Sequence, residues 1–136
     1  MAALSAARNT PQAIGRTRTI PLAANAKVYA GGMVQVAAST YGVAAVATAA
    51  NITVGRAENT VDNTGGANGA ASVKVKAGIF RYANSAAGDL ITRAMIGLPC
   101  YVVDDQTVAA TSNSNARPKA GTIFDVDAQG VWVDFN

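Results

Sequence analysis

The sequence predicts a mainly β protein, in the form of a small curved sheet or barrel-like domain with one short helix and an extended N-terminal arm. Short segments in which apolar and polar residues alternate recur along the chain, and this period of two is typical of half-buried strands. Glycine- and asparagine-rich turns separate the segments, and only one segment has helical spacing. With 136 residues, the chain is long enough for one domain, which we expect over residues 19–136 after an arm over residues 1–18.

The arm is predicted from a lack of pattern. Residues 1–18 show no apolar periodicity and contain Pro11 and Gly15, which favours an extended segment, with a frayed tail as the alternative. Residues 1–57 carry five basic and no acidic residues, whereas residues 58–136 carry six basic and eight acidic ones. An arm with Arg8, Arg16 and Arg18 therefore suits an acidic partner surface. Nucleic acid is a second candidate, but stacking aromatic residues are not interleaved with these basic residues.

Five strands are expected in the first half of the domain. They are residues 19–22, 27–29, 33–37, 42–47 and 52–58. The alanine-rich residues 43–47 have helical propensity, but their short length and their glycine and threonine flanks favour a strand. Residues 59–69 are rich in turn formers, which indicates a loop that is either a contact surface or a disordered tip. This glycine-rich run lacks the lysine–serine pair and the following helix of a phosphate site.

Residues 72–82 form the longest alternating segment and are expected to be one central, curved strand. Val73, Val75, Ala77 and Ile79 fall on one face, and Lys74, Lys76, Phe80 and Tyr82 fall on the other. Gly78 lies inside the pattern, where a glycine usually marks a bend or bulge. We therefore expect Val75 and Ile79 to lie in the core.

The one helix is predicted over residues 89–97. Asp89 is a favourable N-cap, Leu90, Ile91, Ala94 and Met95 share one side, and Gly97 and Pro99 end the segment. Strands are then expected at residues 100–103 and 106–110, and a terminal hairpin at residues 122–127 and 131–135. Residues 111–119 form a second polar loop.

The residue types argue against catalysis. The chain has no histidine and a single cysteine, Cys100, so neither a Ser-His or Cys-His nucleophile nor an intramolecular disulfide can form. Cys100 is most simply a small core residue. Asp125, Asp127 and Asp134 lack the spacing of a helix-loop-helix calcium site, and nothing indicates the paired carboxylates of a glycoside hydrolase. We interpret these three aspartates as the solvent-exposed face of a strand. We expect no enzyme activity, no cofactor and no metal.

Targeting signals are also lacking in the sequence. Its first residues have neither the basic leader nor the long apolar run of a signal peptide, and its most apolar stretch, residues 43–50, is too short for a membrane span. Synthesis in the cytoplasm is therefore expected. Charged residues make up 14% of the chain, against about 25% in ordinary domains, which indicates that parts of the surface contact other protein.

Four stretches together resemble the capsid cement, or decoration, proteins of tailed bacteriophages. They are residues 55–66 (GRAENTVDNTGG), 72–82, 89–105 and 120–134 (AGTIFDVDAQGVWVD), and the likeness extends in order over residues 15–135. It is carried by the succession of turns and strands and by no single motif. The resemblance implies a structural protein of the virion, made in the host bacterial cytoplasm, that binds the outside of the expanded head. There it would hold major capsid protein subunits together.

Other classes remain as alternatives. A head–tail joining or tail structural component of the same particle is the first, a small nucleic-acid-binding barrel is less favoured, and an enzyme is least favoured. The resemblance implies the major capsid protein as partner, with no membrane and no specific nucleic acid. The chain's first half has little charge, which leaves its capsid contacts open, and Arg8, Arg16 and Arg18 are our candidates.

Self-association is expected as well. Functionally similar decoration proteins often act as trimers, and the C-terminal hairpin carries Trp132 and Phe135. Because aromatic residues are enriched in contacts between copies, we expect these two side chains to form the contact of a homotrimer.

Overall fold

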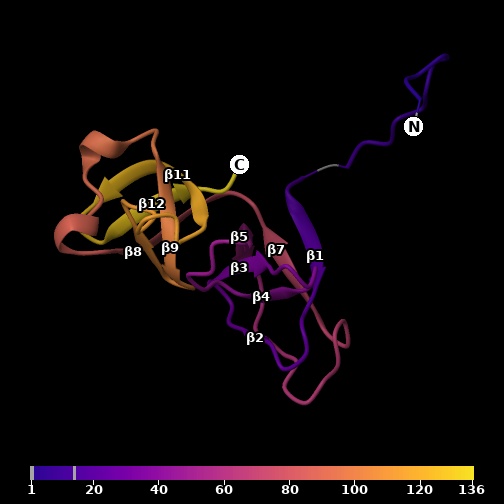
Figure 1. Cartoon of the computed structure of the whole chain (residues 1–136), viewed down its shortest axis with the longest axis horizontal. Helices are drawn as coiled ribbons and strands as arrows, with labels where there is room; N and C mark the ends of the chain where they lie inside the picture. Colours follow the sequence, from indigo (N-terminus) through magenta and orange to yellow (C-terminus); the bar gives the residue numbers. More distant parts are fainter. Residues whose placement is uncertain (1, 14) are drawn as a thin grey trace.

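The computed structural model describes residues 2–13 and 15–136 and is mainly β, as the sequence predicted. Its strands form two lobes that lie side by side, with the N-terminal segment projecting from one of them (Figure 1). We call residues 17–76 the sheet lobe and residues 79–136 the barrel lobe. No helix in the described part of the chain is long and apolar enough to cross a membrane.

The sheet lobe contains a five-stranded antiparallel sheet in the order β1-β7-β5-β3-β4 and a small β2-β6 pair. Its strands are β1 (Thr17–Pro21), β2 (Lys27–Val28), β3 (Met33–Val36), β4 (Gly42–Ala44), β5 (Ile52–Ala57), β6 (Val61–Asp62) and β7 (Ser72–Lys76). The strands of the barrel lobe close in the order β10-β8-β12-β11-β9. They are β8 (Ile79–Asn84), β9 (Pro99–Asp104), β10 (Thr107–Ala109), β11 (Lys119–Asp127) and β12 (Gly130–Asp134).

The predicted central strand is two strands, β7 in the sheet and β8 in the barrel. Val75 is buried as expected, but Ile79 is 38% exposed, so its predicted place in the core is wrong. Tyr82, which was placed on the outer face, is 6% exposed. The reason is the break at Ala77 and Gly78, which carries the chain from one lobe to the other. After this bend the even-numbered residues face the core.

The predicted helix over residues 89–97 is also wrong. Two 3-10 turns stand in its place, η1 (Ala87–Asp89) and η2 (Arg93–Met95). The Asn84 side chain bonds to the backbone of Ile91, which lies between the two turns. Its Nδ2–H donates to the Ile91 carbonyl at 2.8 Å, and its Oδ1 accepts from the Ile91 N–H at 2.9 Å. Because the Ile91 N–H and carbonyl bond to Asn84, they cannot form the backbone hydrogen bonds of a helix. The Ile91 side chain is buried in the core.

Each lobe has a hydrophobic cluster, and the two lobes meet through shared residues. Leu22, Val28, Val34, Ala57, Val73 and Val75 form the cluster of the sheet lobe. Met33 and Ala45 belong to the sheet lobe in sequence but pack in the cluster of the barrel. The Met33 N–H also donates to the Asp105 carbonyl at 2.8 Å. The sheet lobe therefore contributes two of its own side chains to the barrel core.

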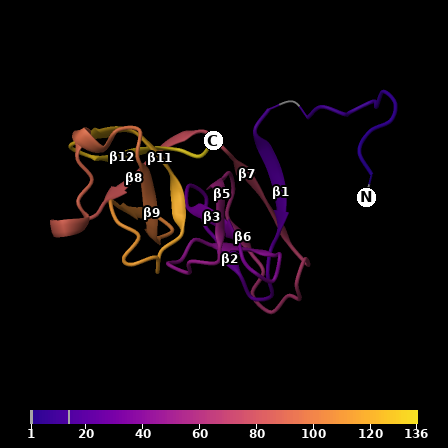
Figure 2. The same cartoon turned by 45° about the horizontal axis from the view of Figure 1, so that its top comes forward.

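Residues 2–13 lie outside both lobes. They form no strand or helix, and every one of them is exposed. Figures 1 and 2 show this segment leaving the body beside β1, on the side away from the barrel. Strand β1 begins at Thr17, so Arg18 lies within a strand and the extended segment is shorter than the predicted arm of residues 1–18.

Candidate functional site

Strand β1 is the terminal strand of the sheet, and its end approaches β4 through a bridge between Leu22 and Gly42. The backbone of its first residues is therefore the candidate contact. The Arg16 carbonyl accepts from the Ala77 N–H at 2.9 Å, and the Leu22 N–H donates to Ala71 at 2.8 Å. Since alternate residues of an antiparallel strand bond to the same neighbour, Thr17 and Thr19 direct their backbone groups away from β7. An additional strand could pair with these groups.

Basic side chains gather around this edge. Arg16 and Arg18 are exposed, as are Lys74 and Lys76 on β7. The register places Lys76 opposite Thr17 and Lys74 opposite Thr19, so the two lysines share one face of the sheet, and Arg18, which is opposite Val75, falls on the other face. We call Arg16, Arg18, Lys74 and Lys76 the basic edge. The sequence indicated the arginines but not the lysines, because only the pairing of β1 with β7 brings residues so distant in the chain together.

Arg8 stands apart from the basic edge. It lies in the exposed segment 2–13 and takes part in none of the ion pairs within the described residues. The three arginines proposed from the sequence are therefore in two places, with Arg16 and Arg18 held at the sheet and Arg8 on the projecting segment.

The two aromatic residues proposed for self-association have contacts within their own chain. The Trp132 Nε1–H donates to Asp127 Oδ2 at 2.9 Å, and the Arg81 guanidinium lies 5.6 Å from the centroid of the Trp132 ring. The Phe135 ring packs against Phe80 and, edge to face, against Tyr82 at a centroid distance of 5.9 Å. Both side chains remain partly exposed, and their role between copies stays a prediction.

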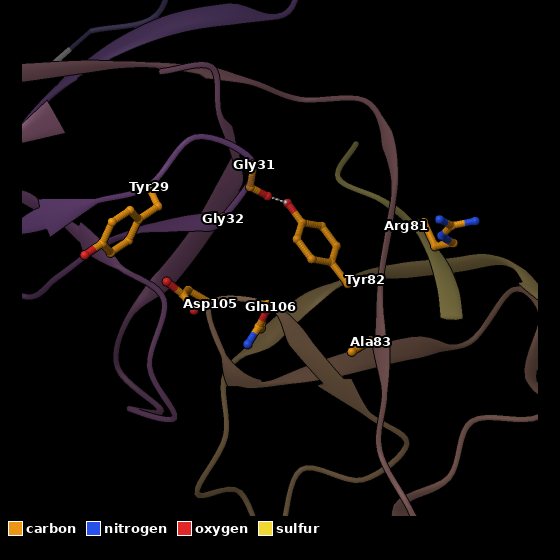
Figure 3. A pocket seen from close by; sticks show the side chains of 8 residues that line it. All are labelled: Tyr29, Gly31, Gly32, Arg81, Tyr82, Ala83, Asp105 and Gln106. Carbon is orange, nitrogen blue, oxygen red and sulfur yellow. Dashed lines mark hydrogen bonds between the residues drawn. The ribbon is translucent and has the colours of Figure 1, made fainter. Parts of the chain in front are cut away.

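A groove of about 510 Å³ runs between the two lobes. Its lining residues are Tyr29, Gly31, Gly32, Arg81, Tyr82, Ala83, Asp105 and Gln106 (Figure 3). The segment between β2 and β3 supplies one wall, and β8 with the β9–β10 turn supplies the other. The Tyr82 hydroxyl donates to the Gly31 carbonyl at 2.8 Å across the groove. Burial raises the pKa of Tyr82, so the phenol stays neutral.

Asp105 gives the groove its charge. Its side chain lies between Tyr29 and Tyr82 in Figure 3, whereas Arg81 extends away from it and donates to Gln129 at 2.7 Å. The Asp105 carboxylate makes no side-chain hydrogen bond or ion pair with the described residues. Partial burial, and then the neighbouring Asp104, raise the pKa of Asp105. The groove therefore holds a carboxylate without a counter-ion.

Asp127 and Cys100, which the sequence analysis also considered, have hydrogen-bonding or packing partners within the chain. Asp127 accepts from the Trp132 indole and from the backbone of the β11–β12 turn, and these bonds lower its pKa. Within the described residues no three His, Cys, Asp or Glu side chains gather in a way that could hold a metal ion. Cys100 is fully buried in the barrel core, as predicted, and burial raises its pKa to about 11.

The loop at residues 59–69 is held in place by asparagine side chains. It contains strand β6, which pairs with β2. The buried Asn63 donates to the carbonyls of Ala23 and Ala67 at 2.8 and 3.0 Å. Asn68 accepts from the Ala24 N–H at 2.8 Å. The loop is thereby fixed against the sheet lobe.

Comparison of the chain with protein-family models, with curated proteins and with solved structures finds no match.

Proposed function

We propose that this chain is a structural decoration protein of a tailed bacteriophage, which binds the outer surface of the head and stabilises contacts between major capsid protein subunits. The resemblance of residues 15–135 to that family suggests the role. The structural observation that supports it is the basic edge, where Arg16 and Arg18 lie at the terminal strand β1 and Lys74 and Lys76 lie on the adjacent strand β7. Such an edge suits an acidic, extended segment of another protein.

The binding mechanism rests on many weak contacts. Arg16 and Arg18 pair with carboxylates of the capsid, and a capsid segment extends the sheet by bonding to Thr17 and Thr19. Each exposed ion pair contributes only about 0–1 kcal/mol. The contacts add up because the same set recurs in every copy on the lattice, where neighbouring subunits are held at a high effective concentration.

The experiment is a binding assay on expanded heads of the phage that encodes the chain, prepared without it. The full chain should sediment with the heads in hundreds of copies per particle. A variant with Arg16→Gln, Arg18→Gln, Lys74→Gln and Lys76→Gln should bind at least about tenfold more weakly. Arg93→Gln, which changes an exposed arginine on the barrel, is the matched control.

Other outcomes separate the alternatives. A handful of copies per virion would assign the chain to the head–tail joint or the tail. Binding to DNA that falls steeply with salt, without binding to heads, would indicate a nucleic-acid-binding protein. Either result overturns the decoration role.

A further inference from the structure

The groove between the lobes has the chemistry of a receptor for a cationic side chain. Its one carboxylate, Asp105, is partly removed from water and forms no ion pair with the described residues. A guanidinium group would supply charge-assisted hydrogen bonds to this carboxylate. The Tyr29 ring, which is 55% exposed, lies beside Asp105 (Figure 3) and can add the attraction of an aromatic face for a cation, whereas the Tyr82 ring is buried in the barrel core.

The cations next to the groove are already engaged. Lys27 Nζ lies 4.9 Å from the centroid of the Tyr29 ring and 3.9 Å from Asp62. Arg56 forms an ion pair of 3.1 Å with Glu58, and its guanidinium stacks 3.9 Å from the centroid of the Phe80 ring. Arg81 bonds to Gln129. None of these side chains neutralises Asp105.

Arg8 is a cation that has no such engagement. It is exposed on residues 2–13, a segment that contains no acidic residue. The nine residue-to-residue steps from Arg8 to Thr17 span roughly 30 Å when extended, at about 3.3 Å per step. This segment leaves the body on the side of β1 away from the barrel (Figures 1 and 2). Its direction favours the groove of another molecule over the groove of its own.

We propose that the groove binds Arg8 from the N-terminal segment of a second copy of this chain, with the guanidinium paired to Asp105 beside Tyr29. The contact links copies head to tail, because groove and segment are different surfaces. It goes beyond the proposed capsid binding, which we assign to Arg16 and Arg18, and it does not depend on that function. It involves other residues than Trp132 and Phe135, whose predicted role between copies it does not test.

A crosslinking experiment in solution tests this contact without the capsid. One variant carries Asn9→Cys, next to Arg8, and a second carries Gln106→Cys at the groove. The two are mixed with a short bismaleimide crosslinker. Crosslinked dimers should form at least about fivefold faster than with Ser39→Cys, an exposed control in the β3–β4 turn. Cys100 is buried and its thiol stays protonated, so the unsubstituted chain should not react.

Charge changes show whether the ion pair carries the contact. Arg8→Glu in the Asn9→Cys chain should lower the crosslinking rate about fivefold, and Asp105→Lys in the Gln106→Cys chain should restore it. Arg8→Glu lies in an exposed segment, so its effect cannot come from unfolding; circular dichroism checks the Asp105→Lys chain. Equal rates at Gln106 and Ser39 would overturn the proposal, as would no loss with Arg8→Glu. A chain with both cysteines that crosslinks only within itself would overturn the second-copy assignment.

Discussion

The Tyr82 hydroxyl donates a 2.8 Å hydrogen bond to the Gly31 carbonyl, which ties the barrel lobe to the sheet lobe. Met33 strengthens the same junction because its side chain packs in the barrel core and its N–H bonds to the Asp105 carbonyl. The chain itself crosses between the lobes at Ala77 and Gly78. These contacts help to hold the two walls of the groove in place.

Removing the Tyr82 hydroxyl should weaken this junction modestly. Tyr82→Phe keeps the buried ring and loses one hydrogen bond, so we expect the free energy of unfolding to fall by about 0.5–1.5 kcal/mol. Tyr82→Ala also removes the ring from the barrel core and should cost about 3–5 kcal/mol. Urea unfolding of the three proteins measures both effects. Equal stability of Tyr82→Phe and Tyr82→Ala would contradict this account of the core.

The bend at Gly78 can be tested by comparing two acidic substitutions. Val75→Asp places an unpaired carboxylate in the core of the sheet lobe and should cost several kcal/mol, so the protein should unfold or aggregate. Ile79→Asp lies just beyond the bend, where the side chain is 38% exposed, and should be much milder. The yield of soluble protein and the midpoint of urea unfolding distinguish the two variants. If Ile79→Asp proved as damaging as Val75→Asp, the face of β8 would be assigned wrongly.

Local patterns predicted the strands well and their connections poorly. Alternation placed β5 and the β11–β12 hairpin within a few residues of their bounds, because those strands each keep one face on a core. The same alternation runs through Gly78 without a break, so the sequence did not reveal that β7 and β8 belong to different lobes. At Asp89 the helical spacing of four apolar residues was misleading, because Asn84 bonds to the Ile91 backbone.

The candidate sites depend even more on tertiary pairing. The sequence identified the arginines and the turn at Asp104 and Asp105. It did not place Asp105 beside Tyr29, which is far away in the chain, because that neighbourhood exists only once the barrel packs on the sheet lobe. Lys74 and Lys76 are included in the basic edge because β7, which carries them, pairs with β1. Sequence alone gives neither relationship.

Asp127 should show an acid titration that depends on Trp132. The indole N–H bond is the largest cause of its lowered pKa, so Trp132→Phe should raise this pKa toward the ordinary value of about 3.9. A lowered folded-state pKa contributes stability above the unfolded pKa, and this contribution is lost as the pH falls through the folded pKa. Carboxyl-carbon NMR of Asp127 measures the shift. An unchanged Asp127 pKa in Trp132→Phe would show that the indole bond is not the cause of the lowered value.

The position of β1 sets how much of the N-terminus can be removed. The arm predicted over residues 1–18 includes Thr17 and Arg18, which pair with β7. A chain without residues 1–13 should keep its melting temperature, since none of the residues described in this segment is buried. A chain without residues 1–21 loses all of β1, including the partly buried Ile20, and should melt several degrees lower. Differential scanning calorimetry compares the two.

The same truncations separate attachment to the capsid from folding. If the basic edge carries attachment, the chain without residues 1–13 retains Arg16, Arg18 and β1 and should still bind heads at low salt. Substituting Arg16 and Arg18 by Gln should release the protein at moderate salt while its melting temperature barely moves, because the exposed pairs are screened. Sedimentation with heads over a range of NaCl concentrations gives the release point. If Arg16→Gln and Arg18→Gln left that point unchanged while removal of residues 1–13 abolished binding, attachment would lie in the projecting segment.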